Sequence, residues 1–158
     1  MGDVVESSGP QLGHLNLKVA DLDRAIAFYC DLGFHVVRRA PGAPIAFLGL
    51  EQRGAFQIGL ALADGAGDGD ERRGLDHFAL VYDSPEALAR ACKGMRDRGV
   101  EPVAAHEYGV SKSVYFEDPD GNGLELYYEY PEAEWPEEEE RFRMRPLDLD
   151  ALLASAAK

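Results

Sequence analysis

The sequence predicts an α+β fold made of two tandem β-α-β-β-β modules, whose curved sheets enclose a shared cleft. The first observation is that one order of patterns, namely a strand, a helix and three strands, occurs twice along the chain. The second is that His14 and His77 lie 63 positions apart, and so do the helix-capping residues Asp21 and Ser84. A histidine in a strand and the cap of the helix that follows it thus recur at the same spacing, which indicates an internal duplication.

The size and charge of the chain limit which functions are open to it. At 158 residues it is long enough for one domain, or for two small halves that share a core. The formal net charge of -13 argues against nucleic acid and anionic membranes as partners, because both require a basic surface. Since the sequence shows neither a signal-peptide pattern nor an apolar stretch of membrane-spanning length, we expect a soluble, cytoplasmic protein. We expect the two cysteines, Cys30 and Cys92, to be reduced thiols.

The first module is expected to cover residues 12–63, after a leader of residues 1–11. Asp21 can cap a helix that runs to Leu32, and Gly33 supplies the residue at which such a helix ends. Alternation of apolar and polar residues predicts the strands of this module. They are residues 12–20, 34–39, 44–50 and 55–62.

The second module is expected to cover residues 75–130, after a linker of residues 63–74 that is rich in Gly and Asp. Ser84 followed by Pro85 is a strong helix start, and that helix is expected to end at Gly99. The same alternation predicts the strands of this half. They are residues 75–83, 100–106, 111–117 and 122–128.

Residues 131–158 form an acidic C-terminal extension with a short helix. Six glutamates surround Trp135 between positions 131 and 140, and such a charge run is most often a solvated connector. Asp148 can cap the short helix that follows. Because Trp135 and the leucines of the helix need cover, we expect the extension to pack over the cleft or over a partner subunit.

The cleft carries the residues with chemical potential. His14 and His77 lie in the first strands of the two modules, where they alternate with leucines and aromatic residues. Glu125 alternates with leucines in the last strand, which follows an Asp-Gly-Asn-Gly turn. Matching the last strands of the halves places Gln57 opposite Glu125, and Tyr115 is expected to point to the same floor. Two imidazoles and one carboxylate form the set that holds Fe(II) with coordination positions left open, so the sequence predicts a metal-binding cleft. The alternative is two ordinary strand histidines and a solvated glutamate.

Three stretches resemble a known family. They are Gly-His-Leu-Asn-Leu-Lys-Val-Ala-Asp-Leu-Asp-Arg-Ala-Ile-Ala-Phe-Tyr, Leu-Asp-His-Phe-Ala-Leu and Tyr-Phe-Glu-Asp-Pro-Asp-Gly-Asn-Gly-Leu-Glu-Leu-Tyr. They resemble the vicinal oxygen chelate superfamily, which contains glyoxalase I, the fosfomycin and bleomycin resistance proteins and the extradiol catechol dioxygenases. The resemblance covers residues 12 to 130, about the length of the two modules, and it implies their fold.

Within that superfamily the chain looks like the catechol 2,3-dioxygenase-like members. This resemblance implies that His14, His77 and Glu125 hold the metal, as Fe(II) or alternatively Mn(II). It also implies catalytic roles for Tyr115 and His106, which lie ten and nineteen residues before Glu125, as the family's tyrosine and histidine do. The implied partners are a small aromatic diol and O2, and we further expect a homodimer.

The chain departs from the dioxygenase pattern at Leu62, which stands where the family has a proton-accepting histidine, and it has only one pair of modules. A glyoxalase-like isomerase or lyase is an alternative, although Gln57 would stand where that reaction needs a glutamate, and an amide cannot take a proton. A fosfomycin-type transferase should show a basic cluster. A third alternative is a non-catalytic protein that sequesters a small molecule such as a drug.

Overall fold

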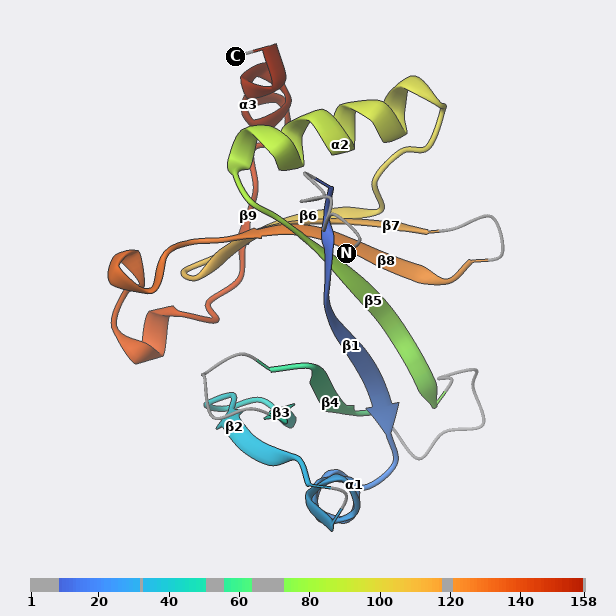
Figure 1. The fold of residues 1–158 in the computed structure, drawn as a ribbon, viewed down its shortest axis with the longest axis vertical. Helices are drawn as coiled ribbons and strands as arrows, with labels where there is room; N and C mark the ends of the chain where they lie inside the picture. The colour runs from blue at the N-terminus through green and yellow to red at the C-terminus, as the bar shows by residue number, and fades with distance from the viewer. Residues whose placement is uncertain (1–8, 32, 51–55, 64–72, 118–120, 158) are drawn as a thin grey trace, which may run out of the picture.

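A computed structural model describes residues 9–31, 33–50, 56–63, 73–117 and 121–157, and these form one nine-stranded sheet with three α-helices. The strands lie in the order β2-β3-β4-β1-β5-β8-β7-β6-β9. The sheet runs through the middle of the molecule, with α1 at one end and α2 near the other (Figure 1). The predicted α+β class is confirmed. The two predicted sheets are continuous, because β1 pairs with β5.

The first module follows the predicted order of elements. α1 begins after Asp21, whose side chain accepts a hydrogen bond from the amide of Arg24 at 2.9 Å. It ends before Gly33, which has a φ of 102° that favours glycine. Ile26 is the buried residue of α1, and it packs on side chains of β3 and β4. The elements are β1 (Gln11–Val19), α1 (Leu22–Asp31), β2 (His35–Arg39), β3 (Ile45–Gly49) and β4 (Ile58–Leu62).

The second module repeats this order. Its elements are β5 (Gly74–Tyr82), α2 (Pro85–Asp97), β6 (Ala104–Tyr108), β7 (Ser111–Glu117) and β8 (Gly123–Glu129). Ser84 caps α2 through a hydrogen bond from the amide of Ala87 at 3.1 Å. The predicted start of this module's second strand at position 100 is wrong, because the amide of Val100 still binds the carbonyl of Met95 and Pro102 has no amide proton.

The sheet shows the duplication directly. β1 pairs in parallel with β4, β5 pairs in parallel with β8, and β1 and β5 pair with each other in antiparallel fashion. Each half therefore has the same strand order, and the halves meet at the β1–β5 seam. The leader up to residue 8, most of the predicted linker (64–72) and part of the turn before β8 (118–120) lie outside the described residues.

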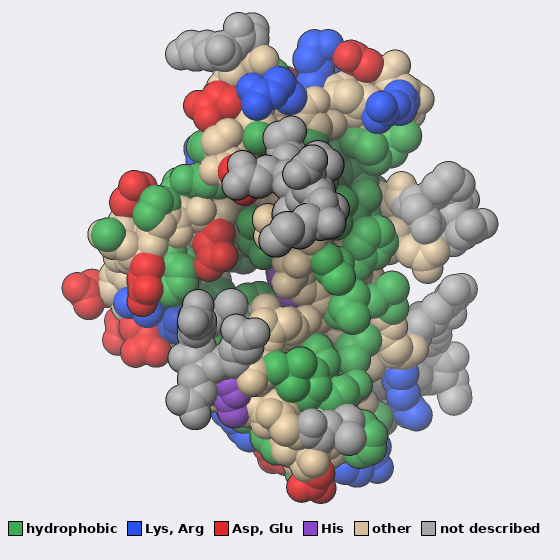
Figure 2. All heavy atoms as spheres, in the orientation of Figure 1, with side chains coloured by type: hydrophobic (Ala, Val, Ile, Leu, Met, Phe, Trp, Pro, Cys, Tyr) green, Lys and Arg blue, Asp and Glu red, His purple; other side chains and the backbone are tan. Residues whose placement is uncertain are grey.

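The C-terminal extension folds back onto both modules. Its elements are η1 (Glu132–Glu134), η2 (Glu138–Glu140), β9 (Arg145–Pro146), α3 (Leu149–Ala154) and η3 (Ser155–Ala157). β9 pairs with β6, and α3 packs beside α2, where Leu152 is buried (Figure 1). Trp135 donates its indole N–H to the carbonyl of Tyr130 at 2.7 Å. Acidic side chains gather on this side of the molecule (Figure 2), yet the extension is packed rather than a free connector.

Two further findings concern the cysteines and membranes. Cys30 is exposed on α1 and Cys92 is buried on α2, and both are free thiols. Burial raises the pKa of Cys92 to about 12, so this thiol stays protonated. In the part of the chain that the structure describes, no helix has the length and hydropathy needed to cross a membrane.

Candidate metal centre

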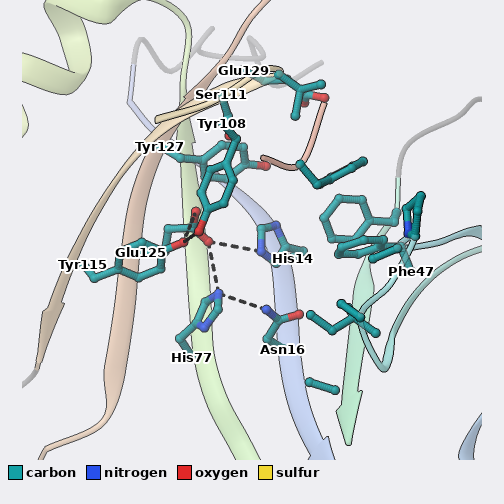
Figure 3. A pocket seen from close by; sticks show the side chains of 18 residues that line it. His14, Asn16, Phe47, His77, Tyr108, Ser111, Tyr115, Glu125, Tyr127 and Glu129 are labelled. Atoms are coloured by element: carbon teal, nitrogen blue, oxygen red, sulfur yellow. Dashed lines mark hydrogen bonds and ion pairs between the residues drawn. The ribbon is translucent and has the colours of Figure 1, made fainter. Parts of the chain in front are cut away.

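Three buried polar side chains converge at the seam between the modules. His14 comes from β1, His77 from β5 and Glu125 from β8, and they point toward one another (Figure 3). A shift in the β1–β5 register at Gly13 forms a bulge just before His14. Glycine is required there because a Cβ would collide with the side chain of Tyr127. The bulge therefore helps to aim His14 at the other two groups.

The distances between these side chains fit one divalent cation. Nε2 of His14 lies 3.2 Å, and Nε2 of His77 lies 3.1 Å, from Oε2 of Glu125. Potential ligand atoms of the three residues all lie within 4.8 Å of one another. Two ligands bound at ~2.1 Å and at right angles to each other are ~3 Å apart, so the two N···O distances suit neighbouring coordination positions. The structure thus provides a potential site for a divalent metal.

The charges of the cluster favour a bound cation. Burial opposes ionisation of Glu125, but hydrogen bonds from His14 and His77 outweigh it and hold the pKa of this carboxyl below its ordinary value. Burial also opposes the charged form of His77, whereas Asp76 and Glu125 raise the pKa of its imidazole to about 9. The site therefore attracts positive charge, which a proton or a metal ion can supply.

Asp76 orients His77 and was missed by the sequence analysis. Nδ1 of His77 lies 2.8 Å from Oδ2 of Asp76, which leaves Nε2 directed into the site. Nζ of Lys18 lies 3.1 Å from Oδ1, the other carboxylate oxygen of Asp76. Successive strand residues normally point to opposite faces, so sequence alternation hides this pair. The register of β1 and β5 shifts here, and Asp76 has no partner residue in β1.

Two tyrosines continue the polar cluster. Tyr115, on β7, donates a hydrogen bond to Oε1 of Glu125 at 3.2 Å, and the hydroxyl of Tyr108 lies 3.4 Å from that of Tyr115. Burial, and then the negative charge of Glu125, raises the pKa of Tyr115, so its hydroxyl remains a donor. His106 lies behind this pair. Its ring centroid is 5.8 Å from that of Tyr115, and it does not line the pocket.

The predicted equivalence of Gln57 and Glu125 is wrong. In the first module Asn16 pairs with Gly59, and in the second Ala79, 63 positions after Asn16, pairs with Glu125. Gly59 is therefore the counterpart of Glu125. Gln57 does not line the pocket, and its side-chain oxygen instead accepts the amide of Leu50 at 2.9 Å.

Asn16 occupies the space that a side chain at position 59 would need. A Cβ on Gly59 would collide with Oδ1 of Asn16. Nδ2 of Asn16 lies 3.3 Å from Nε2 of His77, and Oδ1 is buried without a hydrogen-bond partner among the described residues. Asn16 therefore places an amide beside the cluster where the second module has a carboxylate.

Above the cluster lies a pocket with a volume of about 270 Å³. Its polar floor is formed by the three converging residues and Asn16, and its walls are mostly aromatic. The ring of Phe56 lies 4.7 Å from that of His14 and 4.6 Å from that of Phe47. Figure 2 shows the face hollowed between the two halves. The aromatic lining residues are Phe47, Phe56, Tyr108, Tyr115, Tyr127 and Phe142.

The C-terminal extension supplies one wall of this pocket. Phe142 stacks on Phe47 with ring centroids 5.4 Å apart and planes inclined by 22°. The guanidinium of Arg38 lies over the ring of Phe142, with its Cζ 4.4 Å from the ring centroid. Arg38 also donates to the carboxylate of Glu138 at 3.2 Å. The extension, which follows the second module in the sequence, is thus held against the first.

Comparison with known families decides where the chain belongs. The family model described as the Glyoxalase/Bleomycin resistance protein/Dioxygenase superfamily matches residues 11–126. The chain belongs to this superfamily. The match spans both modules and includes all three residues of the potential metal site.

Relatives in this superfamily include two kinds of enzyme. Catechol-2,3-dioxygenase of Bacillus subtilis (strain 168) is 26% identical, over 92% of this chain and 52% of its own length. Biphenyl-2,3-diol 1,2-dioxygenase 3 of Rhodococcus globerulus is 33% identical, over 74% and 62%. Lactoylglutathione lyase of Haemophilus influenzae (strain ATCC 51907 / DSM 11121 / KW20 / Rd) is 34% identical, over 73% and 90%. The chain spans about half to six-tenths of the length of these two dioxygenases.

Solved structures of the superfamily share the fold. The Mn(II)-bound glyoxalase of Novosphingobium aromaticivorans superimposes with a TM-score of 0.65 at 20% identity, over 82% of this chain and 42% of that one. The 2,2',3-trihydroxybiphenyl 1,2-dioxygenase of Sphingomonas wittichii strain RW1 gives a TM-score of 0.57 at 30% identity, over 74% and 41%. The chain is thus related to superfamily enzymes of both the dioxygenase and the glyoxalase type.

Leu62 stands at the position where the dioxygenases that this chain resembles have a proton-accepting histidine. It is the last residue of β4, and 37% of its surface is exposed. Its neighbour Ala61 lines the pocket, whereas Leu62 does not. The side chain at position 62 therefore lies away from the pocket.

Proposed function

We propose that this chain is a metal-dependent dioxygenase of the extradiol type, which cleaves the ring of a small aromatic diol next to its hydroxyl groups. The observation that carries the proposal is the position of His14, His77 and Glu125 on the floor of an aromatic pocket. Two imidazoles and one carboxylate leave coordination positions open for other ligands. The dioxygenase relatives support the choice of an aromatic diol and O2 as substrates.

The proposed cofactor is Fe(II), with Mn(II) as the alternative. Held by these three residues, such an ion would supply a Lewis acid that lowers the pKa of the diol and brings the two substrates to adjacent positions. The rest of the chemistry belongs to the chain. The aromatic walls would hold the ring of the diol and keep water from its carbon atoms.

Tyr115 is proposed to orient the substrate. Its hydroxyl lies beside Glu125 and on the pocket wall, where its one proton can turn from Oε1 of Glu125 to a substrate oxygen. Asp76 would keep Nε2 of His77 directed to the floor. His106 contacts Tyr115 from the next strand, so we assign it a positioning role that acts through Tyr115.

The experiment is anaerobic reconstitution with Fe(II), followed by addition of air and a panel of catechols. Ring opening next to the hydroxyl groups gives a yellow product, and O2 should be consumed in equal amount. The Tyr115→Phe variant should lower kcat more than it weakens binding, because only the hydroxyl is removed. Failure of the reconstituted protein to consume O2 with any catechol would contradict the proposal.

A glyoxalase-like isomerase is the second candidate, and the lactoylglutathione lyase relative favours it. Gly59 argues against this candidate, because the position equivalent to Glu125 in the first module then has no carboxylate. Supplying the hemithioacetal of methylglyoxal and glutathione to Ni(II)- or Zn(II)-loaded protein distinguishes the two. Isomerisation of that substrate, with no oxygen uptake on catechols, would favour the second candidate.

A further inference from the structure

A second carboxylate, Glu129, lies at the mouth of the pocket. It follows Glu125 and Tyr127 on the same face of β8, because alternate strand residues share a face. Figure 3 shows Glu129 beyond Tyr127, on the side of the site away from His77. Glu129 lies four positions after Glu125 in the strand, which is ~13 Å along the chain. A ring bound at the floor would therefore direct a short substituent toward Glu129.

Glu129 carries a negative charge that no described ion pair neutralises, although burial raises the pKa of its carboxyl and His14 lowers it. The charge of Glu125 is balanced by the cation that it would bind, whereas Glu129 is too far away to be a ligand of the same ion. Among the ion pairs between described residues, none involves Glu129. Of the described side chains that line the pocket, none is Lys or Arg. The mouth of the pocket is therefore negative.

We propose that Glu129 selects the substrate by the charge of its ring substituent, so that a cationic or neutral substituent is accepted and a carboxylate is rejected. This inference rests on the proposed function, because it takes the diol to be bound at the floor. The physical cause is Coulombic. A charge at about 4 Å from another, close to the protein surface, changes binding by an amount on the order of tenfold.

The test uses three catechols of similar size that carry a two-carbon substituent of different charge at ring position 4. They are 4-(2-aminoethyl)catechol, 4-ethylcatechol and 3,4-dihydroxyphenylacetate, with charges of about +1, 0 and -1 at neutral pH. Their Kd values are measured by calorimetry on Zn(II)-loaded protein, because Zn(II) has no redox chemistry and no turnover intervenes. The expected order is amine tightest and carboxylate weakest, with steps on the order of tenfold that shrink at high salt.

Substitutions of Glu129 then test whether this residue causes the order of the three Kd values. Glu129→Gln should bring the three Kd values within about twofold to threefold of one another, and Glu129→Lys should reverse their order. The matched control is Glu117→Gln, because Glu117 is exposed at the opposite end of the β7–β8 pair and does not line the pocket. It should keep the wild-type order.

The outcomes separate this inference from the proposed function. If all three diols bind and the order is the same in the wild type and in Glu129→Lys, the inference is overturned while the proposed function stands. If the carboxylate binds more tightly than 4-ethylcatechol to the wild type, it is also overturned. If no diol binds to the metal-loaded wild type, the proposed function fails, and the inference fails with it.

Discussion

Asn16 and Gly59 show how one residue pair distinguishes two otherwise similar modules. The Asn16 side chain fills the space above Gly59 and reaches Nε2 of His77. Its Oδ1 is buried and has no hydrogen-bond partner in the part of the chain that the structure describes, which costs free energy unless a ligand or water satisfies it. Asn16 is therefore a polar group held ready beside the proposed metal.

The Gly59→Ala variant should lose stability, because the new Cβ forces Asn16 out of its position. We expect a loss of about 1–3 kcal/mol in the free energy of unfolding, the usual cost of overpacking. Denaturant unfolding measures it. The double variant Gly59→Ala/Asn16→Ala should recover most of this loss, since the collision is then absent. Equal losses in the single and double variants would show that Asn16 is not the cause.

The ligand assignment predicts the metal content of single variants. His77→Ala and Glu125→Gln should each abolish stoichiometric Fe(II) binding, because each removes one of three ligands. Elemental analysis after reconstitution and desalting gives the metal content, and circular dichroism checks the fold. The matched controls are His35→Ala and Glu117→Gln, which change the same residue types outside the pocket. Full iron retention by His77→Ala or Glu125→Gln would refute the assignment.

At this scale the sequence is informative where alternation is regular. His14, His77 and Glu125 are predictable because each sits in a strand whose apolar residues face the other way. Alternation also puts Asn16 on the face of His14, and it lines the pocket there. Asp76 is not predictable in this way, because alternation would turn it away from His77 and the β1–β5 register shifts beside it. Gln57 was misplaced because the last strands were matched by residue pattern, whereas pairing with the first strand sets the register.

Among the elements, the C-terminal extension does two separable things. Its helix α3 covers the apolar face of α2, where Leu152 is 5% exposed. Its loop before β9 brings Phe142 against Phe47 and forms a pocket wall. Gly109 allows this loop to approach closely, since a Cβ there would lie 2.6 Å from the carbonyl oxygen of Glu140.

Two point variants should separate these tasks. Leu152→Ala should lower the free energy of unfolding by about 2–5 kcal/mol through a cavity beside α2, and leave the affinity for a diol unchanged. Phe142→Ala should weaken diol binding, because it removes a wall of the pocket. Thermal melts and calorimetry measure the two effects. Truncation after Tyr130 should show both, and a truncated protein as stable as the full chain would contradict the packing described.

Trp135 and the leucines of the extension indicated that it needs cover, but the contacts that it makes were the least predictable from sequence. Its six glutamates are typical of a solvated segment, and the contacts that hold it come from Arg38, Phe47 and Gly109, all far away in the chain. The helices were predictable because their ends carry local signals, such as Ser84 with Pro85. A segment held by distant partners carries no such signal.

At the scale of the whole molecule, the site joins the two halves. His14 belongs to the first module, and His77 and Glu125 belong to the second, so an ion held by all three would be shared across the β1–β5 seam. The duplication that places them there is visible in the sequence as the 63-residue offset. That the two sheets join edge to edge is set by backbone pairing, which the offset does not specify.

Metal loading should therefore stabilise the whole fold and not only the site. At a free metal concentration of about 100 times the Kd, the stabilisation is about 2.7 kcal/mol, which corresponds to a rise in Tm of roughly 5–10 °C. Thermal melts with and without Fe(II) or Zn(II) measure the shift, and a chelator should reverse it. The Glu125→Gln variant should show no shift. An equal rise in that variant would mean that the ion stabilises the protein from another place.

The antiparallel seam has a geometric consequence. His14 faces Ala79 as Asn16 faces His77, so a half-turn rotation about an axis through the seam exchanges the two modules. The same rotation carries Glu125 onto Gly59. A perfectly symmetrical copy of this scaffold would surround its ion with two nitrogen and two oxygen donors. In this chain a single hydrogen atom at position 59 leaves the ring of donors incomplete on one side.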